Sequence, residues 1–262
     1  MEVSMTFVYT TTLLITVVAA LLVFNMYRKA HTDFIDERVL PIQNFPSSFD
    51  GVRIFFISDI HRRILDNHTI HAISSIDLVI IAGDLMERGV PMENVRENIT
   101  RLKQLNAPLY FIWGNNDYEG DYHDLDALLL DEGVHILGNS AVEFESETGD
   151  TFNVLGIDPY LHHEGNSGFA FEGANSKCKI MVIHDPSIFE QLPQEQQEQV
   201  DLVLSGHTHG GQIRFMGLGL SERGGLKTVN GIPVFISEGY GTRLIPFRLG
   251  TRAECHILTI TG

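Results

Sequence analysis

Cysteines are scarce in this sequence, and repeats are absent from it. Only two of the 262 residues are cysteines, Cys178 and Cys255, and both lie in apolar runs. A framework of disulfide bonds is therefore not expected, and each thiol is predicted to be a small buried hydrophobe. The chain has no fixed-period repeat and no low-complexity tract, and its 44% hydrophobic and 20% charged residues are typical of globular proteins.

Basic residues are also few, which excludes some classes of partner. Lys and Arg number 18 against 34 Asp and Glu, so the formal net charge is −16. Nucleic acids and polybasic membrane contacts depend on clustered Lys and Arg, so no nucleic-acid partner is expected. A phosphorylated small-molecule or lipid substrate is still compatible with this charge, since bound metal cations can reverse the local field.

The N-terminal stretch of residues 6–27 contains no charged residue. As a helix it would be about 33 Å long and would cross a hydrocarbon core of about 30 Å. A cleaved secretory signal is the alternative, but it needs a positive segment before the apolar run and a small-residue cleavage site after it. Here only Glu2 precedes the run, and Arg28 and Lys29 follow it. We therefore expect a single-pass anchor in the cell membrane over residues 1–28, with the rest of the chain on the cytoplasmic side.

The anchor is followed by a short stretch of mixed charge that ends near Pro46. Such a composition predicts a juxtamembrane tether over residues 29–50 that leads into a soluble domain over residues 51–262. A domain of this length is long enough to bury a sizeable core and to fold as one unit.

Apolar, strand-like runs alternate with polar clusters throughout the soluble domain. The runs that end in such a cluster are residues 52–58, 77–82, 109–113, 178–183 and 200–204. Further strands are predicted at residues 152–157, 233–237 and 255–260, and helices at residues 92–105 and 191–199. The pattern predicts an α/β fold, a four-layer α/β/β/α sandwich of two mixed sheets with flanking helices, preceded by one transmembrane helix.

The polar clusters carry residue types that ligate divalent metals. They contain Asp59, His61, Asp84, Asn115, His184, His207 and His209. In layered α/β folds ligands bind beyond the carboxyl ends of strands, so these side chains are expected along one edge. A single Asp or His at a strand end is usually a turn former or a solvated side chain, but this reading does not account for the whole set. Seven nitrogen and oxygen donors suit two ions that share a carboxylate, and Asp84 in its sharp Gly-Asp turn is the predicted bridge.

These motifs, taken in order, resemble those of a known enzyme family. They are Ser58-Asp59-Ile60-His61, Gly83-Asp84-Leu85-Met86-Glu87-Arg88, Gly114-Asn115-Asn116-Asp117, His184 and Gly206-His207-Thr208-His209. The series resembles that of the calcineurin-like metallophosphoesterases and extends over residues 51–262. Two further stretches, Gly210-Gly211-Gln212 and Glu238-Gly239-Tyr240-Gly241-Thr242-Arg243, are similar to the membrane-associated bacterial branch of that family.

The resemblance implies a ligand set and a reaction. One ion is expected on Asp59, His61, Asp84 and His209, and the other on Asp84, Asn115, His184 and His207. The implied metals are two divalent ions, Mn, Fe or Zn. The implied reaction is hydrolysis of a phosphodiester or pyrophosphate bond, in which a hydroxide that bridges the metals attacks phosphorus. Arg62 and Arg88 adjoin the metal motifs and are candidates for binding the substrate phosphate, although a solvated surface arginine is the alternative for each.

The third motif departs from the family at Asn116, where most members have histidine. That histidine is assigned to protonation of the leaving group or to the transition state, and asparagine cannot deliver a proton at neutral pH. Asn116 is therefore a catalytic position at which this chain differs, which favours a leaving group that needs little protonation, as in a pyrophosphate of a lipid-linked or nucleotide-type substrate. Two alternatives stay open: a broad phosphodiesterase or phosphatase for soluble substrates, and a catalytically impaired metal-binding scaffold.

Overall fold

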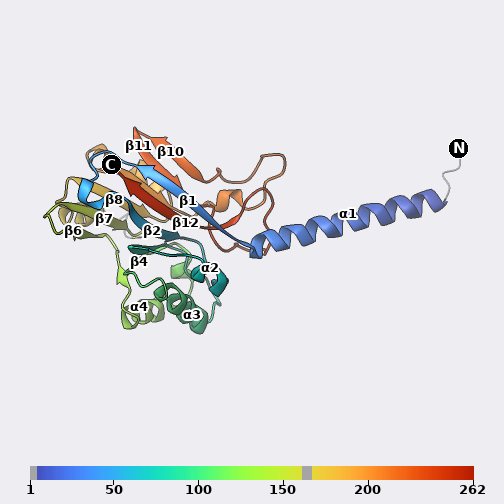
Figure 1. Cartoon of the computed structure of the whole chain (residues 1–262). Coiled ribbons are helices and arrows are strands. Elements are labelled where there is room, and N and C mark those ends of the chain that lie inside the picture. The colour runs from blue at the N-terminus through green and yellow to red at the C-terminus, as the bar shows by residue number, and fades with distance from the viewer. Residues whose placement is uncertain (1–4, 161–166) are drawn as a thin grey trace.

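The computed structural model describes residues 5–160 and 167–262, and it contains two six-stranded sheets (Figure 1). The first sheet has the order β1 (Asp33–Pro41), β12 (Ala253–Thr261), β2 (Val52–Ile57), β3 (Leu78–Ala82), β4 (Leu109–Ile112) and β5 (His135–Ile136). The second has the order β10 (Gly225–Val229), β11 (Ile232–Ile236), β9 (Leu202–Ser205), β8 (Cys178–Ile183), β7 (Thr151–Ile157) and β6 (Ser140–Glu145). Both sheets mix parallel and antiparallel pairs, as predicted.

Alternating side chains along the strands fill the space between the four layers. In β2, Ile54 and Phe56 face the core between the two sheets, where they meet residues of the second sheet such as Phe235. Phe55 and Ile57 face the other way, into a core shared with the helices outside the first sheet. A third core lies between the second sheet and its own helices. The predicted four-layer α/β/β/α sandwich is confirmed.

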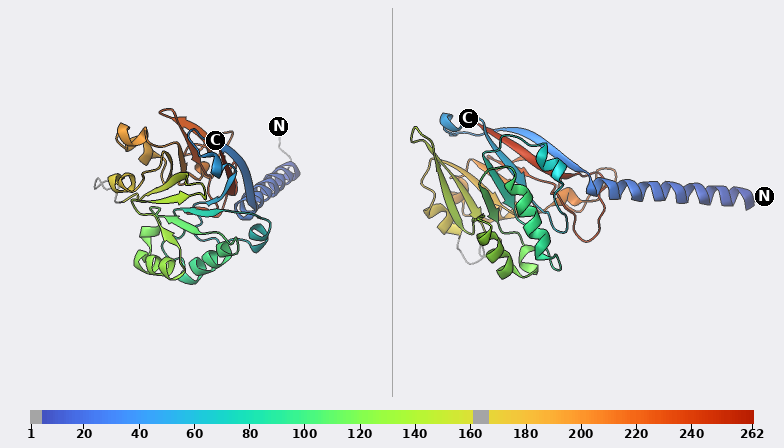
Figure 2. Two further views of the ribbon diagram at one scale, coloured as in Figure 1. Left: turned by 60° about the vertical axis from the view of Figure 1, so that its left-hand side comes forward. Right: turned by 60° about the horizontal axis from the view of Figure 1, so that its bottom comes forward.

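The helices lie on the outer faces of the two sheets (Figure 2). They are α2 (Asn67–His71), α3 (Met92–Lys103) and α4 (Tyr122–Asp131) on the first sheet, and α5 (Ser167–Glu172), α6 (Ser187–Gln191) and α7 (Gln194–Gln197) on the second. The helix predicted at residues 92–105 is thus α3. The helix predicted at residues 191–199 is shorter than expected: α6 ends at Gln191, Pro193 separates the two helices, and only α7 lies within the predicted range.

A 27-residue helix, α1 (Met5–His31), projects from one side of the domain (Figure 1). The apolar stretch of this helix is not covered by any other part of the described chain. Its length and composition are sufficient to cross a membrane, and Arg28, Lys29 and His31 lie in its last turn. Basic side chains at a helix C-terminus also oppose the negative end of the helix dipole.

The stretch of residues 29–50, which the sequence predicts as a tether, contains strand β1. Strand β1 pairs in parallel with β12 over nine residues, from Asp33↔Ala253 to Pro41↔Thr261. Its Leu40 is buried in the core between the sheets, together with Phe45 further along the chain. The connection between α1 and the domain is therefore a strand of the first sheet.

Phe56 provides a test of the core between the sheets. Its side chain is fully buried, and its ring lies 6.3 Å from the ring of Phe235. Replacing Phe56 with alanine is expected to destabilise the domain by about 3–5 kcal/mol, through lost burial and a cavity. The melting temperature should fall by about 6–20 °C in circular dichroism of the detergent-solubilised chain. The Leu130→Ala variant, at an exposed site on α4, should melt within about 2 °C of the wild type, and an equal shift in both variants would contradict this assignment.

Candidate metal centre

The predicted ligands meet where strands of both sheets end. Backbone hydrogen bonds join the loops after β2 and β3, from Asp59 N to Gly83 O at 3.0 Å and from His61 N to Asp84 O at 3.0 Å. The two sheets approach each other at the same place, because Gly206, after β9, lies against Ser58 and Asp59. A methyl group on Gly206 would come within 2.7 Å of Asp59 Oδ2, so the close approach requires glycine here.

Six of the seven predicted ligands form two compact groups. The first consists of Asp59, His61 and His209, and the second of Asp84, His184 and His207; within each, the possible ligand atoms lie within 4.8 Å of one another. The sets that the family resemblance implies differ from these groups in sharing Asp84 between both and in adding Asn115 to the second. Asn115, the seventh, is adjacent to Gly114, which itself packs against Asp84.

Short distances between ligand atoms define the first group. His209 Nε2 lies 3.3 Å from Asp59 Oδ1 and 3.1 Å from His61 Nε2. The other oxygen of Asp59 is held in place, since it accepts hydrogen bonds from Ser58 Oγ at 2.6 Å and from the backbone nitrogen of His207 at 3.1 Å. Asp59 Oδ1 is thereby directed toward the histidines.

The second group also has short distances between its potential ligand atoms, and it lies next to the first group. His184 Nε2 lies 3.1 Å from Asp84 Oδ2 and 3.2 Å from His207 Nδ1. The Nδ1 atom of His184 is 2.8 Å from the carbonyl oxygen of Ala82, which leaves Nε2 for the centre. Asp84 Oδ2 is also 3.7 Å from His61 Nε2 of the first group, so this oxygen lies between the two groups.

The donor set fits divalent cations. Asp59 Oδ1 and Asn115 Oδ1 are buried and accept no hydrogen bond from the part of the chain that the structure describes. A buried oxygen without a partner costs about 1–3 kcal/mol, and a cation would satisfy both atoms. Imidazole nitrogens with carboxylate and amide oxygens suit Mn, Fe and Zn. The residues present therefore fit two divalent ions.

Five of the seven predicted ligands have strained backbone. Left-handed φ values occur at Asp59 (56°), His61 (51°), Asp84 (53°), His207 (69°) and His209 (48°). Each such non-glycine residue costs on the order of 1–3 kcal/mol, and conformations of this kind cluster at functional sites. The strand ends are thus bent to aim these side chains inward.

The pKa values of the buried histidines His184 and His209 are shifted in opposite directions. Burial alone lowers the pKa of His184, but the charge of Asp84 and its hydrogen bond outweigh this effect and raise that pKa to about 10. Burial lowers the pKa of His209 to about 3, so His209 is neutral at physiological pH. A cation that binds at His184 must therefore displace its proton, whereas His209 is ready to ligate.

Glu87 and the two candidate arginines lie beside the centre. Glu87 Oε2 is 3.2 Å from His61 Nδ1, and its other oxygen accepts from Arg62. Arg62 also donates to the carbonyl oxygen of Arg88 at 2.9 Å, and Arg88 donates to the carbonyl oxygen of Glu119 at 3.4 Å. Both arginines are exposed, so the structure places them at the rim of the centre while Glu87 fixes the ring of His61.

Asn116 faces the carboxylate of Asp84. Its backbone nitrogen donates to Asp84 Oδ1 at 2.8 Å and its side-chain amide to Asp84 Oδ2 at 2.5 Å. Asn116 is only 2% exposed. The position at which the family resemblance expects an acid is therefore occupied by an uncharged amide that donates a hydrogen bond to Asp84 and orients it.

Sequence reasoning missed two supporting residues. Asp117 is fully buried and accepts hydrogen bonds from the backbone nitrogens of Asp84 and Gly114, both at 2.8 Å; burial and the charge of Asp84 raise its pKa to about 7. It closes the third motif, which is the signal that could have identified it. Arg248 is also fully buried, and its Nη2 lies 3.4 Å from His209 Nδ1. Burial lowers the pKa of Arg248 to about 10, and no motif surrounds it.

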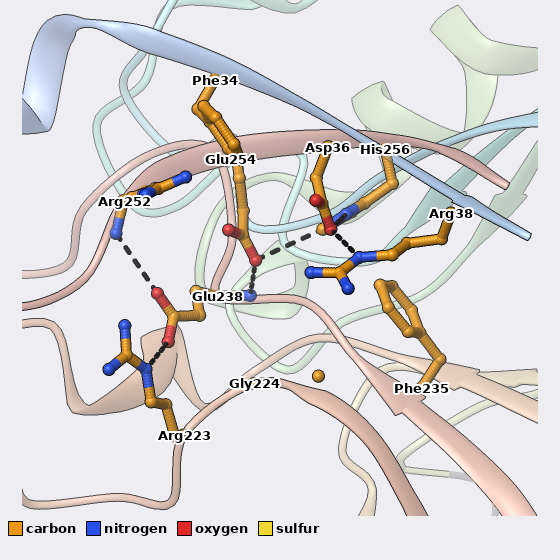
Figure 3. A pocket seen from close by; sticks show the side chains of 11 residues that line it. Phe34, Asp36, Arg38, Arg223, Gly224, Phe235, Glu238, Arg252, Glu254 and His256 are labelled. Atoms are coloured by element: carbon orange, nitrogen blue, oxygen red, sulfur yellow. Dashed lines mark hydrogen bonds and ion pairs between the residues drawn. The ribbon is translucent and has the colours of Figure 1, made fainter.

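A pocket of about 260 Å³, lined by charged side chains, lies beside Glu238 (Figure 3). On its wall, Glu254 accepts a hydrogen bond from the backbone nitrogen of Glu238 at 2.8 Å, and His256 Nε2 lies 2.9 Å from Ser237 Oγ. These contacts fix the segment 237–241, whose Gly239 packs against Asp59. The charged groups of the pocket thus hold a loop that positions a predicted ligand.

Comparisons with known proteins agree with this geometry. A family model described as calcineurin-like phosphoesterase matches residues 52–211, more than half of the chain. The chain belongs to the calcineurin-like phosphoesterase family. It is accordingly a metal-dependent phosphoesterase, as the resemblance predicted.

Relatives of this metallophosphoesterase include proteins of bacteria and vertebrates. It is 39% identical to the Bacillus subtilis protein YpbG over 251 residues, which cover 95% of each chain. The Bacillus subtilis metallophosphoesterase YkoQ is 29% identical over 194 residues, 68% of this chain and 70% of that protein. A zebrafish transmembrane protein with a metallophosphoesterase domain is 29% identical over 277 residues, 93% of this chain and 61% of that protein.

Proposed function

We propose that this metallophosphoesterase hydrolyses a phosphodiester or pyrophosphate bond with two divalent metal ions, while anchored in the cell membrane by α1. One observation carries the proposal: six side chains of metal-ligating type from four strand ends converge in two adjoining groups, and the buried oxygens Asp59 Oδ1 and Asn115 Oδ1 accept no hydrogen bond from the described chain. Asp59, His61, Asp84 and His209 would hold one ion, and Asp84, Asn115, His184 and His207 the other.

The chemistry divides between the metals and the chain. When bound, two divalent cations would lower the pKa of a shared water to near neutrality and neutralise the oxygens of the substrate phosphate. The chain contributes the positions of the ligands. Asp117 holds the turn that carries Asp84, and Glu87 holds the ring of His61. Arg248 contacts Nδ1 of His209, whose Nε2 faces the other predicted ligands.

The surroundings of Asn116 favour a pyrophosphate bond as the target. An alkoxide leaving group needs a proton, and general acid catalysis typically contributes about 10²–10⁴-fold. A phosphate leaving group, with a pKa near about 6, needs little such help. Since Asn116 offers no acid and its amide is engaged by Asp84, we infer a lipid-linked or nucleotide-type substrate with a pyrophosphate linkage.

The orientation of the anchor follows from its flanking charges. Arg28 and Lys29 come directly after the uncharged stretch of α1 and precede the catalytic domain. By the positive-inside rule, this arrangement favours a cytoplasmic catalytic domain.

A substrate panel tests the reaction class. The full chain in detergent is stripped with EDTA and then supplied with Mn, Zn, Fe or Mg. We expect EDTA to remove activity, re-added metal to restore it, and a nucleoside diphosphate ester to be cleaved at least about tenfold faster than an alkyl phosphodiester. Faster turnover of the diester would refute the argument on leaving groups. A chain that binds two metals and cleaves none of these substrates would favour the scaffold alternative.

A further inference from the structure

Two loops, the first at residues 212–224 and the second at residues 237–252, expose a set of large apolar side chains. The set, here termed the apolar rim, consists of Phe215, Met216, Leu218, Leu220, Leu244 and Ile245. Leu220 is fully exposed and Leu244 is 94% exposed. Soluble surfaces rarely gather several large apolar residues at such exposure without a partner.

The two loops of the apolar rim form one unit. Gln212 Oε1 accepts a hydrogen bond from the backbone nitrogen of Arg243 at 2.8 Å, and Gln212 Nε2 donates to the carbonyl oxygen of Ile245 at 3.0 Å. A bridge pairs Ile213 with Leu249. The bases of the two loops are therefore fixed to each other, and their apolar tips belong to the same end of the domain.

The same unit contacts the end of α1. The backbone nitrogen of Arg248 donates to the carbonyl oxygen of Met26 at 3.0 Å, and the rings of Tyr27 and Phe247 meet edge to face at 6.5 Å. These contacts lie where the uncharged stretch of α1 gives way to Arg28. Figure 1 and the right-hand view of Figure 2 show the orange to red loops on the side of the domain from which α1 projects.

We propose that the apolar rim is a second membrane contact, which inserts beside α1 into the headgroup region of the leaflet that faces the catalytic domain. The inference rests on the proposed anchoring by α1. A helix that leaves the bilayer near Tyr27 places the segment 244–248 at the level of the headgroups, because this segment is bonded to its last uncharged turn. Apolar side chains at that level insert into the boundary between headgroups and acyl chains, as amphipathic membrane-surface segments do.

The apolar rim also connects the bilayer to the metal centre. Arg214, in the first loop, donates to the carbonyl oxygen of Gly210 at 2.9 Å, directly after His209. Arg248, in the second loop, lies against the ring of His209 itself. Insertion of the rim therefore sets the centre at the lipid surface, and the substrate class is an amphiphile whose phosphoryl group lies among the headgroups.

Depth-dependent quenching tests the contact without any assay of activity. The full chain is reconstituted in vesicles of phosphatidylcholine and phosphatidylglycerol, with an environment-sensitive dye on Leu220→Cys, Leu130→Cys or Val18→Cys. The native Cys178 and Cys255 are buried, so labelling is selective. We expect lipid-borne spin labels to quench the dye at position 220 at least threefold more than at position 130, an exposed site on α4.

Each other result would overturn the proposal in a distinguishable way. Quenching at position 18 together with a water-exposed dye at position 220 would show that α1 inserts and the apolar rim does not. A water-exposed dye at both positions would remove the anchor as well. Shielding of position 220 in detergent, with the mass of a dimer, would assign the rim to a second copy of the chain.

A second measurement tests the consequence for the substrate. The combined Phe215→Ser, Met216→Ser, Leu218→Ser and Leu220→Ser variant is compared with a Leu130→Ser, Phe169→Ser control, which removes exposed apolar residues elsewhere. The ratio of turnover on a bilayer-embedded phosphate ester to turnover on a water-soluble one should fall at least tenfold in the first variant alone. An unchanged ratio would overturn the route from the bilayer.

Discussion

Replacing Asp84 with asparagine is expected to abolish hydrolysis, with turnover at least about 10³-fold below the wild type. Asp84 Oδ2 lies 3.1 Å from His184 Nε2 and 3.7 Å from His61 Nε2, so a single oxygen faces both groups of ligands. Asparagine keeps the size of the side chain but removes the negative charge that would be shared by two cations. The metal content should fall from two ions per chain to one or none, as measured by mass spectrometry of the desalted protein.

The fold should survive this substitution. The backbone nitrogen of residue 84 keeps its hydrogen bond to Asp117, and the side-chain oxygen of asparagine can still accept from the backbone nitrogen of Asn116. Asp131→Asn, at an exposed site on α4, is the matched control and should leave both turnover and metal content unchanged. An Asp84→Asn chain that binds two ions and turns over normally would exclude Asp84 as the bridge.

The sequence predicts the layers of this fold because most of its strands have a clear local pattern of apolar residues. β2, β3, β4, β8 and β9 are short, mostly apolar runs that end close to a Gly, Ser or His, and the sequence predicts each of them at its observed place. β1 was missed for the opposite reason. It carries Asp33, Asp36 and Arg38, and its pairing partner β12 lies more than 200 residues further along the chain. A charged edge strand whose partner is so remote has no local pattern to identify it.

The candidate site shows the same division. Ligands at strand ends can be predicted because each follows a visible strand, and the structure brings six of them together. Their metal-binding roles stay predictions. The contacts that orient them depend on distant segments: the backbone nitrogen of His207 donates to Asp59 across 148 residues, and Arg248 reaches His209 across 39. No periodicity or motif encodes such contacts, so Arg248 emerges only from the folded chain, whereas Asp117 closes a motif that is visible in the sequence.

Introducing histidine at position 116 is expected to raise turnover of an alkyl phosphodiester by about 10²-fold and turnover of a pyrophosphate by less than about tenfold. An imidazolium beside Asp84 can protonate an alkoxide, whereas a phosphate leaving group gains little from a proton. The new diester activity should decline as pH rises through the pKa of the added imidazole, because only the protonated form is an acid. This limb of the pH profile distinguishes acid catalysis from a change in shape.

Asn116→Ala is the control that separates the two roles of the native side chain. It removes the 2.5 Å hydrogen bond to Asp84 Oδ2 and adds no acid, so we expect no gain on the diester. Because position 116 is only 2% exposed, metal content and melting temperature must be measured for both variants. If Asn116→His is folded and holds two metals but leaves diester turnover unchanged, the leaving group is not what selects the substrate, and the preference for pyrophosphate must come from residues that contact the rest of the molecule.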